Sequence, residues 1–325
     1  MKKCVSIIIP TFQRSNQLIK ILDSLKNQID DWNFFEILIC DSYSCDNSQL
    51  YVNNFIEKNN LNKIKYLNIK TNILAAKRNF GIRTAIYKYL ILIDDDCIPQ
   101  KEFVKSFLDD FEKIDEETIL SGVIEYPSNL LKLSNYLKFR NSRHFSKNQI
   151  DKNLILEPKY FVAMNMGLIK SQKLLDLGLF NENFIGYGFE DFEFAYRTQK
   201  NGFKLKQTRA TILHDEGIPS LSNYLKKYFH LGRDGMKNFL KINKNTAKKT
   251  IYYKIENNLF FKIFMKIPFI KILLFQFEKL VIKFDDNKLF CFSVVYNFAR
   301  LSAYLRGAAA RNERDLNPTN NNWYD

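Results

Sequence analysis

The sequence YLILIDDD, from Tyr89 to Asp96, changes from an apolar run to three consecutive carboxylates. Five apolar residues in a row are typical of a strand that is buried on both faces of a parallel sheet. Three adjacent carboxylates repel one another, and this repulsion favours a bound cation. Mg²⁺ and Mn²⁺ prefer carboxylate oxygens and often bridge to substrate phosphates. The stretch therefore predicts a divalent metal site, with an acidic loop that caps a helix as the alternative.

Further β-rich runs alternate with helical patterns in the first 125 residues, which predicts an α/β fold with a mostly parallel sheet and crossover helices. The predicted strands are 5–9, 35–40, 64–69, 89–93 and 119–124. Between the first two strands, apolar residues recur at helical spacing, which predicts a helix with Ser15 as its N-cap. The apolar positions are Leu18, Ile21, Leu22, Leu25 and Ile29.

Polar residues follow three of the predicted strands, in 10–14, 41–46 and 94–96. In open α/β sheets, ligands bind outside the carboxyl ends of the strands. We therefore expect the three clusters to meet in one crevice.

The segment 72–81 places Lys77 and Arg78 among small residues at a predicted helix start. Arginine and a helix N-terminus both suit a diphosphate, and small residues permit close approach. The alternative is an amphipathic helix with Lys77 and Arg78 in solvent. The sequence contains neither a P-loop nor a GxGxxG pattern.

Residues 186–193 form a second acidic cluster, in which Gly186 and Gly188 precede Glu190 and Asp191. Glycines let a backbone approach a ligand, and adjacent carboxylates can abstract a proton and bind a hydroxyl. The alternative is an acidic helix N-terminus without catalysis.

Three histidines occur in the chain, and one of them ends a short apolar run. This residue, His214, is a candidate third metal ligand together with the carboxylates, although a lone histidine is more often structural. His144 and His230 have no comparable context, and we interpret them as surface or packing residues.

The last third of the chain is strongly basic. Residues 221–325 carry 19 Lys and Arg against 8 Asp and Glu, a surplus of 11 within a net charge of +14. Residues 260–275 are very apolar but contain lysines, and no run reaches the roughly 18 apolar residues of a spanning helix. The sequence predicts a boundary between a domain of residues 1–218 and a helical region of residues 219–325. The stretch 260–275 is either a segment that lies in a membrane interface or a buried helical subdomain with solvated lysines.

Composition excludes disordered and collagen-like classes, because 46% of the 325 residues are hydrophobic and only 11 are glycine. The five cysteines are scattered and include no CxxC pair, which predicts reduced thiols in the cytoplasm. The apolar run near the N-terminus ends at Pro10, so we interpret it as a first strand and not as a signal peptide.

Taken in order, five motifs resemble family 2 glycosyltransferases of the GT-A fold. They are residues 5–14, 40–42, 72–81, 93–96 and 188–191, and the resemblance spans residues 1–218. Residues 186–191 further resemble the Trp-Gly-x-Gly-Glu-Asp motif of β-1,4-galactosyltransferases and bacterial chondroitin-type polymerases. Tyr187 stands in place of the tryptophan of that motif, and Phe189 in place of a glycine. The resemblance implies a Rossmann-like mixed sheet, flanked by helices, that binds a nucleotide sugar.

The resemblance also implies roles for individual residues. Asp41 would bind the uracil, Arg78 would approach the donor sugar or diphosphate, and the other donor-binding residues would be Pro10, Thr11, Arg14, Asp94 and Asp95. Asp96, Asp94 and His214 would bind Mn²⁺ or Mg²⁺. Asp191 would be the general base, and Glu190 would hold the acceptor hydroxyl together with Tyr187 and Gly188.

The predicted activity is inverting, metal-dependent transfer of a galactose-, N-acetylgalactosamine- or glucose-type sugar from a UDP-sugar. The acceptor would be a bacterial surface glycan, such as capsule or lipopolysaccharide, free or lipid-linked. The predicted location is the cytoplasm or the inner face of its membrane, where residues 219–325 would meet anionic lipid; no nucleic-acid partner is expected. The alternatives are a nucleotidyltransferase and a non-enzymatic basic protein that binds membrane or nucleic acid.

Overall fold

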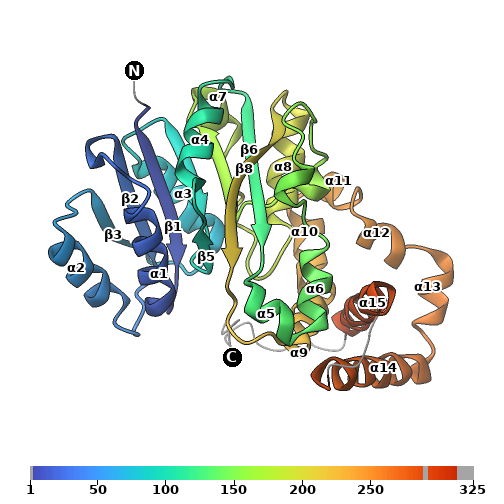
Figure 1. The fold of residues 1–325 in the computed structure, drawn as a ribbon. Helices are drawn as coiled ribbons and strands as arrows, with labels where there is room; N and C mark the ends of the chain where they lie inside the picture. The colour runs from blue at the N-terminus through green and yellow to red at the C-terminus, as the bar shows by residue number, and fades with distance from the viewer. Residues whose placement is uncertain (1–2, 288–291, 313–325) are drawn as a thin grey trace. The chain divides into compact units, whose positions relative to one another are not determined.

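The computed structural model describes residues 3–287 and 292–312 (Figure 1). The chain divides into two compact units, and each is described here by itself. The first unit comprises Met1–Pro127, His144–Glu182 and Phe194–Glu216, and the second comprises Ser128–Arg143, Asn183–Glu193 and Gly217–Asp325. Two segments from the first two thirds of the chain thus belong to the unit that contains the C-terminal region. The predicted pair of domains, 1–218 and 219–325, stays a prediction.

Within the described residues, the first unit contains a mixed sheet in the order β3-β2-β1-β4-β7-β6-β8-β5. The strands are β1 (Val5–Thr11), β2 (Phe35–Asp41), β3 (Ile64–Asn68), β4 (Tyr89–Ile93), β5 (Cys97–Pro99), β6 (Thr118–Glu125), β7 (Asn165–Ile169) and β8 (Lys204–His214). β1 pairs in parallel with β2 and β4, whereas β7 runs antiparallel to β4 and β6. All five predicted strands are present, as β1, β2, β3, β4 and β6.

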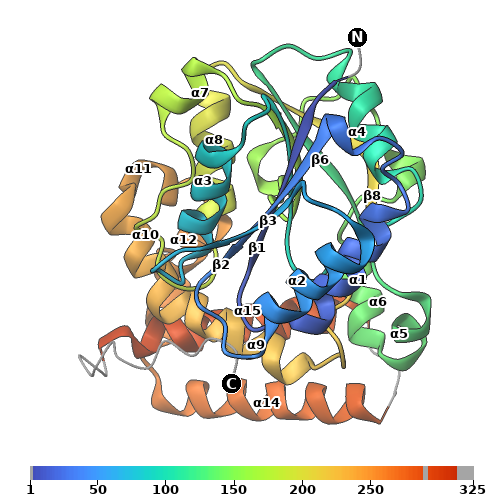
Figure 2. The ribbon, with the colours of Figure 1, turned by 90° about the vertical axis from the view of Figure 1, so that its left-hand side faces the viewer.

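Helices cover both faces of this sheet (Figure 2). One face packs against α1 (Ser15–Lys26), α2 (Ser48–Asn59) and α4 (Phe103–Phe111), and the other against α3 (Leu74–Thr84), α7 (Gln172–Leu177) and the part of α8 (Glu190–Lys200) that lies in this unit. Alternate residues of a strand point to opposite faces, so Ile7 joins the first core and Ile8 the second. Both faces are buried, which explains why these strands are apolar throughout.

The first helix begins differently from the prediction. Arg14, and not Ser15, occupies the N-cap position, and the Arg14 side chain makes no capping hydrogen bond. Ser15 is already helical, and its backbone N–H donates to Asp46 Oδ2 at 2.9 Å. The predicted serine cap is therefore wrong, because a carboxylate from the loop after β2 takes over that function. Four predicted apolar positions of this helix are buried: Leu18, Ile21, Leu22 and Leu25.

Short helical turns complete the first unit: η1 (Trp32–Phe34), η2 (Lys147–Gln149) and η3 (Pro158–Tyr160).

The second unit is helical. It contains α5 (Ser128–Leu133), α6 (Asn135–Asn141), α9 (Leu221–His230), the π-helical turn η4 (Leu231–Gly235), α10 (Met236–Ile242), α11 (Lys244–Ala247), α12 (Ile251–Glu256), α13 (Leu259–Phe264), α14 (Pro268–Asp286), α15 (Ser293–Ala309) and η5 (Ala310–Asn312).

Two glycines allow α15 to approach η4 and the end of α9 closely. A Cβ on Gly307 would lie 2.0 Å from the Phe229 carbonyl oxygen, and one on Gly232 would lie 2.1 Å from that of Tyr304.

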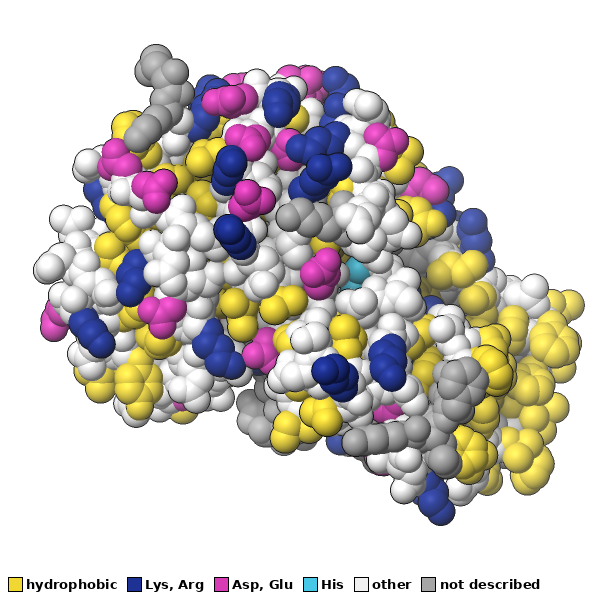
Figure 3. All heavy atoms as spheres, viewed as in Figure 1, with side chains coloured by type: hydrophobic (Ala, Val, Ile, Leu, Met, Phe, Trp, Pro, Cys, Tyr) yellow, Lys and Arg dark blue, Asp and Glu magenta, His cyan; other side chains and the backbone are white. Residues whose placement is uncertain are grey.

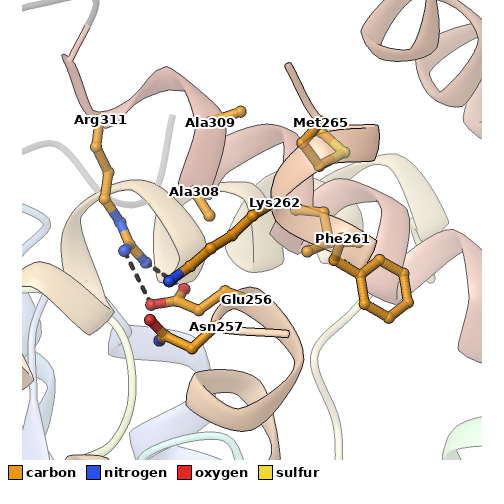
Figure 4. Close-up of a pocket in the computed structure, with 9 residues that line it drawn as sticks. Glu256, Asn257, Phe261, Lys262, Met265, Ala308, Ala309 and Arg311 are labelled. Atoms are coloured by element: carbon orange, nitrogen blue, oxygen red, sulfur yellow. Dashed lines mark hydrogen bonds and ion pairs between the residues drawn. The ribbon is translucent and has the colours of Figure 1, made fainter. Parts of the chain in front are cut away.

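A cavity of about 230 Å³ lies in this unit (Figure 4). An ion pair closes one side of it, because Arg311 Nη2 lies 2.8 Å from Glu256 Oε2, and Lys262 points toward the same pair. The lining contains none of the residues predicted for the sugar-transfer site.

Across residues 3–287 and 292–312, no helix combines the length and the apolar character needed to cross a bilayer.

Candidate active site

The carboxyl ends of β1, β2 and β4 lie side by side in the sheet, as the sequence predicted for its polar clusters. Thr11 stands opposite Asp41 in the parallel pair of β1 and β2, and β4 pairs with the other edge of β1. The Thr11 hydroxyl donates to Asp95 Oδ2 at 2.8 Å, and the Phe12 N–H donates to the same oxygen at 3.3 Å. The loop after β1 therefore binds the middle carboxylate of the triple-aspartate run.

This middle carboxylate has a perturbed pKa. Burial raises the pKa of Asp95 to about 7, and the adjacent charge of Asp96 adds to the rise. Arg14 and the hydrogen bond from Thr11 oppose the rise. Arg14 also lies 4.0 Å from Asp96. Negative charge is thus costly at this position, as expected for carboxylates gathered to receive a cation.

Lys77 and Arg78 lie in the first turns of α3, and their side chains are buried, with 4% and 1% exposure. The alternative that placed them in solvent is wrong. Arg78 Nη2 donates to both carboxylate oxygens of Asp94, and Lys77 Nζ donates to the Thr11 carbonyl at 2.8 Å and to Asn72 Oδ1 at 2.7 Å. Burial lowers the pKa of Lys77 to about 8, although the carboxylates of Asp95 and Asp41 oppose this change.

Two residues predicted to bind the donor nucleotide, Pro10 and Asp41, lie at the ends of β1 and β2. Pro10 is buried and stands opposite Cys40 in the parallel pair. Asp41 is buried and accepts hydrogen bonds from the Ser44 N–H at 2.7 Å and from the Ser44 hydroxyl at 2.5 Å. The following loop therefore orients the Asp41 carboxylate.

His214 ends β8 and lies beside the triple-aspartate run, because it pairs with Cys97 of β5. Its side chain is buried, and its Nδ1 lies 3.3 Å from the Tyr126 hydroxyl. Its Nε2 lies 3.4 Å from Asp96 Oδ1 and 3.3 Å from Glu216 Oε1. The structure thus brings His214 to Asp96, as the resemblance implied.

Two neighbours of His214, Glu216 and Tyr126, were not predicted from the sequence as site residues. Glu216 had a local signal, since it follows His214 by two residues at the end of an apolar run. Tyr126 had none, because it lies 88 residues away from its histidine partner. The ring of Tyr126 also neighbours that of His144, with centroids 6.3 Å apart.

The donor set around His214 fits a divalent cation. One imidazole nitrogen and the carboxylates of Asp96 and Glu216 form a mixed nitrogen and oxygen set, and both kinds of ligand bind divalent metal ions. Among the described residues, no three His, Cys, Asp or Glu side chains are already arranged to hold an ion. The chemistry of the residues therefore matches a metal, and ion binding would require these side chains to adjust.

The predicted acceptor-binding segment belongs to the second unit. Gly186 and Gly188 have left-handed φ angles of 95° and 90°, and Glu190 and Asp191 then form the first turn of α8. Phe189 also has a positive φ, of 73°, at the position where the galactosyltransferase motif has glycine. Its ring packs on Phe239, with centroids 5.1 Å apart. Phe189 therefore adopts a left-handed backbone conformation although it has a large side chain, which packs in this unit.

Tyr187 and His230 also lie in this unit. Tyr187 is exposed, and Lys227 Nζ lies 5.6 Å from the centre of its ring. His230 Nδ1 lies 3.0 Å from Arg233 Nη2, and the interpretation of His230 as a surface or packing residue stays a prediction.

Comparison with known proteins identifies the family. A sequence profile described as glycosyl transferase family 2 matches residues 6–173, more than half of the chain. The chain belongs to glycosyl transferase family 2. The predicted family and enzyme class are thus confirmed.

Curated relatives of this glycosyltransferase include two chondroitin synthases. The protein from Pasteurella multocida (strain Pm70) is 29% identical over 249 residues, covering 67% of this chain and 25% of that protein. The protein from Escherichia coli is 27% identical over 252 residues, covering 67% and 35%. The chain therefore spans about a quarter to a third of the length of these relatives.

Solved structures show the same fold. The mannosyltransferase PcManGT from Pyrobaculum calidifontis, in complex with GDP-Man and Mn²⁺, matches with a TM-score of 0.61 at 16% identity, covering 97% of this chain and 88% of that one. GalNAc-T7 with UDP, GalNAc and Mn²⁺ matches with a TM-score of 0.51 at 15% identity, covering 79% and 58%. The predicted GT-A fold with a helical C-terminal region is confirmed.

Proposed function

We propose that this family 2 glycosyltransferase moves a sugar from a UDP-sugar to a hydroxyl group of a bacterial surface glycan, with inversion at the anomeric carbon. The observation that carries the proposal is the meeting of Thr11, Asp95, Asp96 and His214 at the carboxyl edge of the sheet. Family membership favours this function over a nucleotidyltransferase and over a non-enzymatic basic protein.

In this proposal, the donor occupies the crevice at the ends of β1, β2 and β4. Asp41 binds the base, and the loop after β1 contacts the nucleotide. Arg78 is a donor-site residue that also positions Asp94, since it is bonded to both of its carboxylate oxygens. The remaining donor contacts would come from Pro10, Thr11, Arg14 and Asp95.

Asp96 and His214 are the proposed metal ligands, with Asp94 and Glu216 as further candidates. A bound Mn²⁺ or Mg²⁺ would supply positive charge for the diphosphate that departs. Mn²⁺ is present in the solved structures of PcManGT and GalNAc-T7, which supports a divalent ion here.

Asp191 is the proposed general base. It takes the proton of the acceptor hydroxyl while that oxygen forms its bond to the anomeric carbon, and the bond from this carbon to the diphosphate oxygen breaks. Glu190 binds the same hydroxyl, and Tyr187 and Gly188 contact the acceptor. One displacement inverts the configuration, and no covalent enzyme intermediate forms.

We place this chemistry in the cytoplasm, at the inner face of the membrane, with a capsule- or lipopolysaccharide-type acceptor. The chondroitin synthase relatives support a polysaccharide product. Cys4, Cys40, Cys45 and Cys97 are free thiols, which fits a reducing compartment, and Cys291 lies outside the described residues.

Calorimetric titration tests the donor. UDP-galactose, UDP-N-acetylgalactosamine, UDP-glucose and GDP-mannose are each titrated with Mn²⁺ and with EDTA. We expect one UDP-sugar to bind only with the metal, and the acceptor reaction to release UDP. Binding of none of them, or release of pyrophosphate, would contradict the proposal.

A further inference from the structure

The helix α14 buries the apolar Leu274 and Val281, but it also buries acidic residues and exposes large apolar side chains, which reverses the usual pattern of a helix in water. Its acidic residues Glu278 and Asp285 are buried, with 3% and 6% exposure. Its outer face carries large apolar side chains, among them Phe269 and Ile272 at 61% and 57% exposure. From this reversal and the charges around it, we propose that the outer face of α13 and α14 docks on an anionic lipid bilayer. This inference does not depend on the proposed sugar transfer.

Polar contacts inside the second unit hold α14 in this orientation. Arg306 of α15 donates to Glu278 from Nε at 2.8 Å and from Nη2 at 2.6 Å, and the Ser302 hydroxyl donates to Glu278 at 2.6 Å. Asp285 accepts a hydrogen bond from the Tyr296 hydroxyl at 2.7 Å. Rotating α14 to bury its apolar face would break these contacts and strand Arg306 in the interior. The apolar face is therefore directed outward by the fold.

The apolar surface continues beyond α14. Figure 3 shows hydrophobic side chains gathered at the right-hand edge, over α13 and the adjoining end of α14. We call this surface the outer apolar face. Its exposed members are Leu259, Phe260, Ile263, Ile267, Phe269, Ile272, Leu273, Leu280 and Phe284. Contiguous exposed apolar side chains of this extent mark an interaction surface.

Lysines accompany these apolar residues. Lys266, Lys279 and Lys283 are exposed, whereas the one exposed acidic side chain of the described helices α13 and α14 is Asp286, at the end of α14. Basic residues beside Phe, Ile and Leu suit a helix that lies in the interface of an anionic membrane. Their flexible stems let the ammonium groups reach lipid phosphates while the apolar side chains enter the acyl region.

A second protein surface is a poorer match for the outer apolar face. Lysine is depleted from the centres of protein interfaces, because burying its charge is costly. Here the lysines alternate with the apolar residues along the helices and do not surround them. Charge and pattern together therefore favour lipid over another copy of this chain.

Vesicle flotation of the full chain tests the proposal. One set of vesicles contains phosphatidylcholine alone, and another contains equal amounts of phosphatidylcholine and phosphatidylglycerol. We expect binding to the second set, weakened by high salt. The apolar variant Phe269→Ser/Ile272→Ser/Leu280→Ser and the charge variant Lys266→Gln/Lys279→Gln/Lys283→Gln should each lower the partition coefficient at least about tenfold.

Matched control variants carry the same changes on the first unit. They replace exposed Leu50, Ile86 and Leu154 by serine, or exposed Lys58, Lys101 and Lys105 by glutamine, and should keep wild-type binding. Circular dichroism checks that every variant is folded. Binding of a folded apolar variant at the wild-type level would overturn the proposal. Failure of the wild-type protein to bind anionic vesicles would also overturn the proposal. The same holds if the wild type fails to bind them and light scattering shows a dimer that the apolar variant dissociates.

Discussion

Arg78 of α3 binds Asp94 of the triple-aspartate run through both carboxylate oxygens, at 2.9 and 3.0 Å from Nη2. The arginine is buried, and the aspartate side chain is 18% exposed. This ion pair fixes the first carboxylate against the helix that covers the sheet, while Asp96 lies near His214. The three consecutive carboxylates therefore have three different partners, because Thr11 binds Asp95.

Breaking the Arg78–Asp94 pair should destabilise the protein. We expect Arg78→Met to lower the free energy of unfolding by about 2–4 kcal/mol, since it leaves a half-buried carboxylate without its main cation. Urea denaturation measures this change. In the double variant Arg78→Met/Asp94→Asn, the loss should be smaller than the sum of the single losses. Additive losses would show that the pair contributes no coupling energy.

Removing a proposed metal ligand should abolish metal-dependent donor binding. We expect His214→Gln to weaken Mn²⁺ binding at least about tenfold, because nitrogen and carboxylate ligands set the affinity of such a site. Titration calorimetry with Mn²⁺ alone measures the affinity for the metal. The same variant should also lose UDP binding. His144→Gln is the matched control and should bind Mn²⁺ as the wild type does. Unchanged affinity in His214→Gln would remove this histidine from the metal site.

The general base should be separable from donor binding. Asp191→Asn keeps the size of the side chain but cannot take a proton, so transfer should fall by about 100-fold or more. Binding of the UDP-sugar should stay at the wild-type level. Glu57→Gln, which changes an exposed carboxylate of α2, should leave both quantities unaffected. If Asp191→Asn lost donor binding as well, the assignment as base would be wrong.

Lys77 should make stability depend on pH above neutrality. Burial lowers its pKa to about 8 from an ordinary value of 10.5. Between these values the folded state binds fewer protons than the unfolded state, so the contribution of Lys77 to the free energy of unfolding rises with pH. Relative to Lys77→Met, the wild type should gain up to about 1.4 kcal/mol per pH unit in this range. Urea midpoints at pH 8 and 10 measure the gain, and a difference that does not vary with pH would contradict it.

Local signals were sufficient for five of the eight strands in the described sheet and for the polar clusters at its edge. The run from Tyr89 to Ile93 is apolar because both faces of β4 are covered, and the helical spacing from Leu18 to Leu25 reflects one buried face of α1. Burial requires apolar residues at regular spacings along a strand or helix, so these spacings can be recognised in a single sequence. The resemblance to family 2 glycosyltransferases likewise rested on short motifs, each of which consists of neighbouring residues in the sequence.

Contacts between residues distant in the sequence carry no such signal, and only the three-dimensional fold decided them. Tyr126 meets His214, and Asp46 replaces the predicted cap at Ser15, because strand order brings separate loops together. Lys77 and Arg78 resemble solvated residues in sequence but are buried because carboxylates and carbonyls from other strands receive them. On α14, the composition was compatible with either a buried or an exposed apolar face. The direction of the apolar face was set by Arg306, because the charge of this arginine requires Glu278 to face inward.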